Sequence, residues 1–519
     1  MCCVSYSIVM FYAAKVGFII TVLTALVVYG LRITANRPAG KVSQIATFAT
    51  AGSFAILCIS QIWVALFGIA VITACYANRR IYAAGISIFM IVTMPGTGVT
   101  LMVGDVKLII LSLTTAVTIG MLIASVSWEG QFRSKKYTNI YPLFAIFIVL
   151  TFISARGSSV TVMLRAFTEN FVSYIIPYIL IRSSLRDFRS ISITAMFVIA
   201  AGLAVSAIAI FESFMVWPIY QTYGQSFGTL INAGVKMRGG MLRAAGPSMN
   251  PPLSSAGLAL CFVTAFASAS LFKTKIGHWM VLTVIALGLF VMQARVGWLG
   301  AVVGSVAVLV SKRGIRTFAT YIPIIMLLSG GIYGLAQVNE KFANLTGFSA
   351  DAKGSSEYRE QMSDRGIQIV KDHILIGQPV SSVENQMENF RQGEGIVDFV
   401  NGYLAIALFS GLLGLALFVS ALLVQAFNGY AGKKVALARG AGSLADLGFG
   451  LAIGATIMFP FIPTDYRVIL VMLLLFALSN AVITHSHINP FNKSNLKRDR
   501  KNLIAESGIN RKNDAEISI

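Results

Sequence analysis

Apolar runs of about twenty residues recur along most of the chain, separated by short basic or glycine-rich stretches. A helix of that length crosses a hydrocarbon layer about 30 Å thick, whereas the strands of a membrane barrel would appear as shorter segments of alternating hydrophobicity. The pattern therefore predicts an all-α, polytopic membrane protein with about fourteen transmembrane helices.

The basic clusters predict how these helices alternate across the membrane. Lysine and arginine collect in cytoplasmic loops, and clusters such as Arg79 with Arg80 alternate with glycine-rich or proline-rich turns on the outer side. The expected spans are 8–31, 42–78 (two helices with a turn near Ser60), 81–95, 106–128, 141–155, 160–181, 191–216, 253–272, 279–292, 299–310, 317–337, 402–426 and two segments before residue 485.

The same pattern divides the chain into five regions. They are an N-terminal transmembrane bundle (1–189), central transmembrane helices with an outer loop at 217–252 (190–337), a large outer loop (338–400), C-terminal transmembrane helices (401–485) and a basic cytoplasmic tail (486–519).

The large outer loop contains an amphipathic pattern. Tyr358, Met362, Ile369 and Val370 recur at roughly helical spacing among charged residues. We expect an amphipathic helix here that lies on the membrane surface.

Composition changes how the charge is interpreted. The chain has 41 Lys and Arg against 21 Asp and Glu, a net charge of +20, which in a soluble protein would suggest a nucleic-acid partner. Because 56% of the residues are hydrophobic and the basic residues cluster in short loops, membrane orientation accounts for most of this charge. The expected partners are membrane lipids and no nucleic acid.

Six arginines do not fit that explanation, because they fall on the outer side. They are Arg243, Arg295, Arg359, Arg365, Arg391 and Arg467.

Four of the six are candidates for binding an anion: Arg243, Arg295, Arg359 and Arg365. Arg243 and Arg295 stand beside glycine or proline in the outer stretches LRAAGPSMNPP and QARVGWLG. Guanidinium groups match phosphate oxygens, and small neighbours let a bulky headgroup approach the backbone. Such groups would suit a lipid-linked diphosphate, although Arg243 alone could instead cap a loop or contact lipid headgroups.

Asp398 and Asn401 are one helical turn apart where the chain enters the next span. A carboxylate there is a candidate base for a sugar hydroxyl, but Asp and Asn also favour helix N-caps. The sequence contains no metal-ligand cluster, phosphate-binding loop or nucleophile elbow, so no cofactor or metal is expected.

The motifs RAAGPSMNPP, ARVGWLGAVVG, IVKDHILIG and VNGYLAIALFSGLLGLALF, in this order, resemble the O-antigen ligase and Wzy-type polysaccharide polymerase superfamily. The resemblance covers about residues 241–419. It implies a GT-C-like, metal-independent glycosyltransferase of the bacterial inner membrane, with an active site that faces the periplasm and uses undecaprenyl-diphosphate-linked oligosaccharides as donor and acceptor. Other polysaccharide export components are further expected partners.

Carried over by position, the resemblance implies that Arg243, Arg295 and Arg359 hold the diphosphate and that Asn401 matches the Asn of a His-Asn pair. Val400 stands where ligases commonly have the His. This departure favours the exopolysaccharide or capsule polymerase branch, with Asp398 as a substitute for the His.

Two other functions stay open. One is a ligase that joins polymer to a lipid or protein acceptor. The other is a transporter or flippase for lipid-linked sugars, which would place buried charges such as Lys15, Arg165, Glu169, Glu212 and Asp446 along a path across the membrane.

Overall fold

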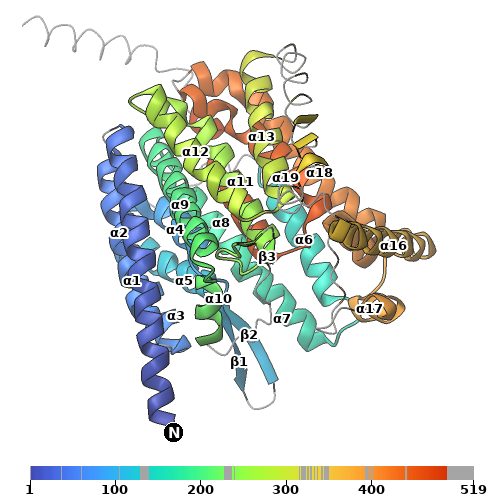
Figure 1. Cartoon of the computed structure of the whole chain (residues 1–519). Helices are drawn as coiled ribbons and strands as arrows, with labels where there is room; N and C mark the ends of the chain where they lie inside the picture. Colours follow the sequence, from blue (N-terminus) through green and yellow to red (C-terminus); the bar gives the residue numbers. More distant parts are fainter. Residues whose placement is uncertain are drawn as a thin grey trace, which may run out of the picture.

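The protein is a bundle of helices that carries two small β-hairpins (Figure 1). The computed structural model describes residues 2–36, 38–59, 61–103, 106–128, 139–226, 237–238, 240–314, 350–391, 401–438 and 441–487, with isolated positions between 316 and 343 and at 397 and 399.

The N-terminal half contains nine α-helices among these residues. They are α1 (Cys2–Thr34), α2 (Pro38–Leu57), α3 (Ile62–Ala77), α4 (Arg80–Thr93), α5 (Leu113–Ser125), α6 (Tyr141–Ala155), α7 (Val160–Asn170), α8 (Ile176–Ser184) and α9 (Phe188–Met215), with a π-helical turn at Phe171–Ile175 between α7 and α8.

The remaining α-helices lie between residues 219 and 487. They are α10 (Ile219–Ser226), α11 (Pro251–Ala267), α12 (Lys275–Val291), α13 (Arg295–Arg313), α16 (Ala350–Asp372), α17 (Val380–Gln386), α18 (Gly402–Ala438), α19 (Leu447–Met458) and α20 (Tyr466–His487).

The prediction of an all-α membrane protein is confirmed. Among the described residues, six helices are long and apolar enough to cross a membrane, and six more apolar helices are shorter. The break expected near Ser60 falls between α2 and α3. Most of the expected span 317–337 lies outside the described residues, and the number of about fourteen spans stays a prediction.

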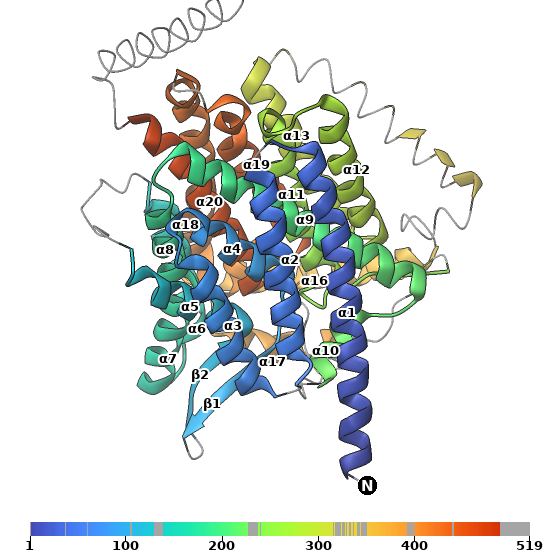
Figure 2. The same ribbon diagram turned by 90° about the vertical axis from the view of Figure 1, so that its left-hand side faces the viewer.

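The centre of the bundle is formed by helices that are apolar on all sides. The most apolar stretch of α9 is 94% buried and that of α20 is 100% buried. α9 contacts α1, α2, α4, α11 and α12, and α1 and α2 lie together along one flank (Figure 2). A helix without a polar face is stable only when other helices or lipid surround it. Because other helices surround α9 and α20, these two helices form the core of the bundle.

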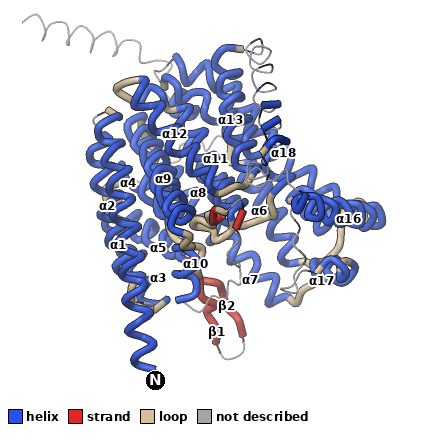
Figure 3. Tube along the Cα trace, in the orientation of Figure 1, coloured by secondary structure: helices blue, strands red, loops and turns tan. Residues whose placement is uncertain are grey.

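The start of one expected span is wrong. Residues 106–112 form strand β2 (Val106–Ser112), which pairs antiparallel with β1 (Gly98–Val103), and helix α5 begins only at Leu113 (Figure 3). The run VKLIILS is rich in β-branched and other apolar residues that suit a strand. Ser112 then ends the strand by capping α5, its Oγ accepting from the Thr115 N–H at 3.1 Å.

The amphipathic helix is confirmed as α16, but its apolar face does not lie on the membrane. Met362 and Ile369 are 2% and 1% exposed and pack with Val383 of α17 and Leu408 of α18. The Tyr358 hydroxyl donates to the Phe390 carbonyl at 2.5 Å. The expected membrane-facing side chains therefore fill a small protein core, because α17 and the start of α18 provide the apolar surface that a membrane would otherwise supply.

Candidate functional site

The candidate site is built from three elements that the fold brings together. They are the hairpin of β3 (Met237–Arg238) and β4 (Met241–Leu242) with the loop that follows it, the turn between α12 and α13, and helix α16. Figure 1 shows β3 close to the ends of α10 and α11.

The loop that carries Arg243 is fastened to the turn between α12 and α13. The Ala244 N–H donates to the Val291 carbonyl at 3.3 Å, and Arg243 Nε donates to the Met292 carbonyl at 3.3 Å. Arg295 begins α13 three residues later and is exposed. These contacts place Arg243 and Arg295 at the same end of the bundle.

Glu212, at the end of α9, contacts both α10 and the loop that carries Arg243. Its carboxylate is fully buried and accepts from the Tyr220 N–H at 3.2 Å and the Gly246 N–H at 3.3 Å. A buried carboxylate is tolerated where backbone donors surround it. Glu212 therefore holds α10 and the Arg243 loop on the rigid end of α9.

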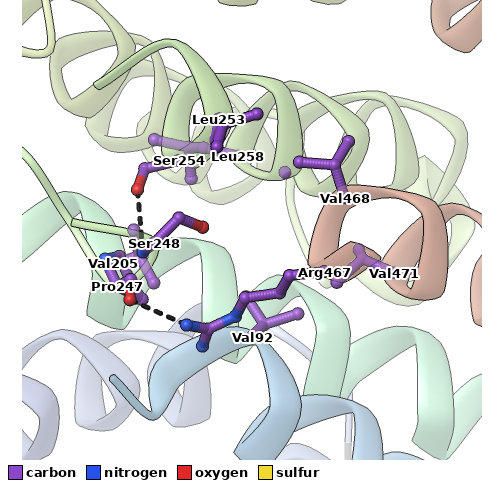
Figure 4. Close-up of a pocket in the computed structure, with 11 residues that line it drawn as sticks. Val92, Val205, Pro247, Ser248, Leu253, Ser254, Leu258, Arg467, Val468 and Val471 are labelled. Atoms are coloured by element: carbon purple, nitrogen blue, oxygen red, sulfur yellow. Dashed lines mark hydrogen bonds between the residues drawn. The ribbon is translucent and has the colours of Figure 1, made fainter. Parts of the chain in front are cut away.

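Arg467 fastens the same loop from another direction. Its guanidinium is buried and donates to the Pro247 carbonyl at 2.7 Å (Figure 4). It also donates to the carbonyls of Ile91 at 2.8 Å and Met94. In the same loop the Ser248 N–H donates to Ser254 Oγ at 3.0 Å. Arg467, which membrane orientation did not explain, thus has a structural role.

Four arginines converge on the resulting site: Arg238, Arg243, Arg295 and Arg359. Burial, followed by the positive charges of Arg238 and Arg359, lowers the pKa of Arg243 to about 10, so this arginine stays charged at neutral pH. Burial and then the charge of Arg359 also lower the pKa of Arg238. Arg295 begins α13 three residues after Met292, whose carbonyl accepts from Arg243 Nε, so Arg295 belongs to the turn that Arg243 contacts.

No carboxylate among the described residues lies within ion-pair distance of Arg238, Arg243 or Arg359. Like charges held close together repel, and the repulsion is relieved when an anion binds between them. Arg359 and Arg295 are exposed, whereas Arg238 and Arg243 are half-buried. The cluster is therefore open to solvent and electrostatically suited to an oxyanion that carries several charges.

Arg365 is not one of the charges that act on Arg238, Arg243 or Arg295. It is exposed on α16, and its Nη1 donates to Gln368 Oε1 at 3.3 Å. It follows Arg359 by six residues, which places the two side chains about 120° apart around the helix. A role for Arg365 at the site stays a prediction.

The structure describes one of the two predicted catalytic residues, Asn401. Asn401 caps α18, because its Oδ1 accepts from the N–H groups of Tyr403 at 3.1 Å and Leu404 at 3.2 Å. This is the simpler role anticipated for it, and a catalytic role stays a prediction. Asp398 and its neighbour Val400 lie outside the described residues.

Arg238 was not among the residues that the sequence singled out. It stands in MRGGML, where Gly239 and Gly240 separate two short segments, and Gly240 adopts a left-handed φ of +81°. A Gly-Gly pair between two such segments is a hairpin signal. Recognising it would have folded Arg238 back beside β4, close to Arg243.

Three of the charges considered for a transport path have local partners, and two of them, Glu212 and Asp446, are buried. Glu212 holds the Arg243 loop, Asp446 accepts from Ser311 Oγ at 2.7 Å and pairs with Lys433 at 3.3 Å, and Glu169 accepts from the Ile110 N–H at 3.0 Å. These contacts account for the three charges without a transported substrate.

The fold and the site together define a helical membrane protein with a cationic site at one end of its bundle. Residues 280–419 match the family model described as O-Antigen ligase, which confirms the sequence resemblance over that part of the chain. The match includes Arg295, Arg359 and Asn401 and begins after Arg238 and Arg243. No curated protein matches the chain.

Proposed function

We propose that the protein is a membrane glycosyltransferase that polymerises lipid-linked glycans. It would transfer a glycan from an undecaprenyl-diphosphate-linked donor to a lipid-linked repeat unit at the periplasmic face of a bacterial inner membrane. The observation that carries the proposal is the convergence of four arginines from three elements, and three of these arginines have no carboxylate of the described residues within ion-pair distance.

The chemistry explains why such a cluster is useful. A hydroxyl oxygen of the acceptor bonds to the anomeric carbon of the donor, and the bond from that carbon to the diphosphate oxygen breaks. The leaving diphosphate gains negative charge, so cations already in place stabilise the transition state. The positions of Arg238, Arg243, Arg295 and Arg359 support this assignment.

The hydroxyl proton needs an acceptor, and Asp398 is the residue we propose for it. It precedes the α18 cap residue Asn401 by three positions, and the His expected in ligases is replaced by Val400. These features favour polymerisation over ligation.

The test uses purified protein in nanodiscs with lipid-linked repeat units, and chain extension is measured. Arg243→Ala and Arg295→Ala should each slow extension by about a hundredfold or more, because donors aimed at a developing oxyanion contribute on that scale. Arg391→Ala is the matched control, an exposed arginine of the large outer loop outside the cluster. Extension at the control rate in both cluster variants would refute the proposed function.

The base assignment is tested separately. Asp398→Asn keeps the size of the side chain and removes the proton acceptor, so extension should fall while binding of undecaprenyl diphosphate stays unchanged. Unaltered extension would exclude Asp398 as the base and leave the arginine assignment intact.

The ligase alternative is distinguished by the product. Supplying finished polymer with either a lipid-linked repeat unit or a lipid acceptor that carries no repeat unit identifies the acceptor that is used.

A further inference from the structure

The turn between α16 and α17 exposes three consecutive apolar side chains. Ile374, Leu375 and Ile376 are 48%, 65% and 53% exposed. Scattered exposed apolar residues are ordinary, but a continuous run is unfavourable in water unless another apolar phase covers it.

The backbone of this turn is built into a break in α18. Gly411 has non-helical backbone angles (φ 66°, ψ −171°). In an uninterrupted helix the N–H groups of Leu412 and Leu413 would bond to the carbonyls of residues 408 and 409. Instead they donate to the carbonyls of Ile374 at 2.8 Å and Leu375 at 3.2 Å.

The carbonyls released by the break also find partners. The Gln378 N–H donates to the Leu408 carbonyl at 2.8 Å. Arg156 Nη1 donates to the Phe409 carbonyl at 3.4 Å and also to the Ile376 carbonyl. Irregular backbone is tolerated at membrane depth only where protein supplies such partners, and this turn meets that condition.

Glycine is required on both sides of the contact. A Cβ on Gly411 would lie 2.3 Å from the carbonyl carbon of Leu375, and one on Gly377 would lie 2.4 Å from the Leu408 oxygen. Both glycines also have left-handed φ angles, +66° and +64°. The turn and the broken helix therefore approach closely enough to form one unit.

The length of α18 sets the depth of this unit. The part beyond the break, residues 412–438, is about 40 Å long at 1.5 Å per residue, enough to cross a hydrocarbon core of about 30 Å. The break thus falls near the outer boundary of the membrane. Leu412 and Leu413, the first residues after it, are 46% and 60% exposed, so the apolar surface of the turn continues the lipid-facing surface of a membrane span.

We propose that Ile374, Leu375 and Ile376 form an interfacial anchor that inserts into the acyl chains of the outer leaflet. The anchor fixes the depth of α16 relative to the membrane, and α16 carries Arg359. Lipid contact is thus made by the turn after the amphipathic helix and not by the apolar face of that helix.

The anchor is tested by labelling in nanodiscs. In a variant without the native cysteines, Leu375→Cys carries an environment-sensitive fluorophore, and Asn385→Cys on α17 is the matched control because it is exposed in the same outer region. We expect blue-shifted emission at position 375 and strong quenching by lipids that carry a quencher on the acyl chain. At position 385 we expect water-like emission and quenching by a soluble quencher.

Emission at position 375 that matches position 385 and is insensitive to lipid quenchers would overturn the proposal. A second variant guards against local unfolding by the label. Leu375→Asp should lower the thermal midpoint in nanodiscs by several degrees more than Asn385→Asp, because only the first change places a charge among acyl chains. Equal midpoints for the two variants would also contradict the anchor.

Discussion

Arg238, Arg243 and Arg359 stay near one another although all three are positive and none has a carboxylate partner among the described residues. Such an arrangement costs folding free energy in the absence of an anion. A cluster that lowers folding stability in the absence of its ligand is typical of a binding site.

Arg238→Ala tests whether the arginine cluster lowers stability in order to bind an anion. Removing one of the mutually repelling charges should leave thermal stability unchanged or raise it. Binding of undecaprenyl diphosphate should weaken by about tenfold, the loss expected for one charge-assisted contact. Binding is measured in nanodiscs beside Arg391→Ala, and a loss of stability without a loss of affinity would show that Arg238 is structural.

Arg467 should behave in the opposite way. It is buried and satisfies three backbone carbonyls from two segments, so Arg467→Met leaves those acceptors unpaired. The expected cost is several kcal/mol, because each buried acceptor left unpaired costs about 1–3 kcal/mol. Thermal unfolding in nanodiscs measures it, and a variant as stable as the wild type would show that the carbonyls find other partners.

At the scale of elements, α13 is held against its neighbours by glycine. A Cβ on Gly304 would lie 2.5 Å from Val263 of α11 and 3.1 Å from the Gly450 carbonyl of α19. Small residues allow such close helix packing within membranes. Since α13 begins with Arg295, this packing also sets the position of one arginine of the site.

Gly304→Leu should therefore separate α13 from α19 and α11. We expect a loss of more than about 3 kcal/mol, comparable to severe overpacking, together with reduced chain extension. Val302→Leu is the control on the same helix, because Val302 is 46% exposed. Equal unfolding midpoints for the two variants would contradict the requirement for glycine.

At the scale of the whole molecule, α13 begins at the site with Arg295 and ends in the basic pair Lys312 and Arg313, so the proposed orientation places these two ends on opposite sides of the membrane. A cysteine replacing Met237 on the β3–β4 hairpin should react with an impermeant reagent from outside intact spheroplasts. A cysteine replacing Arg313 at the end of α13 should react only after permeabilisation. Both native residues are exposed, so the reverse pattern would invert the proposed orientation.

The sequence by itself determined the features that depend on one-dimensional patterns. Membrane thickness imposes the length of apolar runs, so the all-α membrane class and the break between α2 and α3 could be read directly. Helical spacing revealed α16, and motif order indicated the family that residues 280–419 match. The expected alternation of basic loops made Arg243, Arg295 and Arg359 candidates for the site, and their role stays a prediction.

Only the tertiary structure decided which outer groups meet. Arg467 contacts the carbonyl of Ile91, 376 positions away, and so became a support for the site instead of a ligand group. The β3–β4 hairpin added Arg238, residues 106–112 became a strand, and the apolar face of α16 was covered by protein. In each case a backbone group or an apolar face needs a partner. That partner comes from a distant part of the chain, so the local sequence does not predict it.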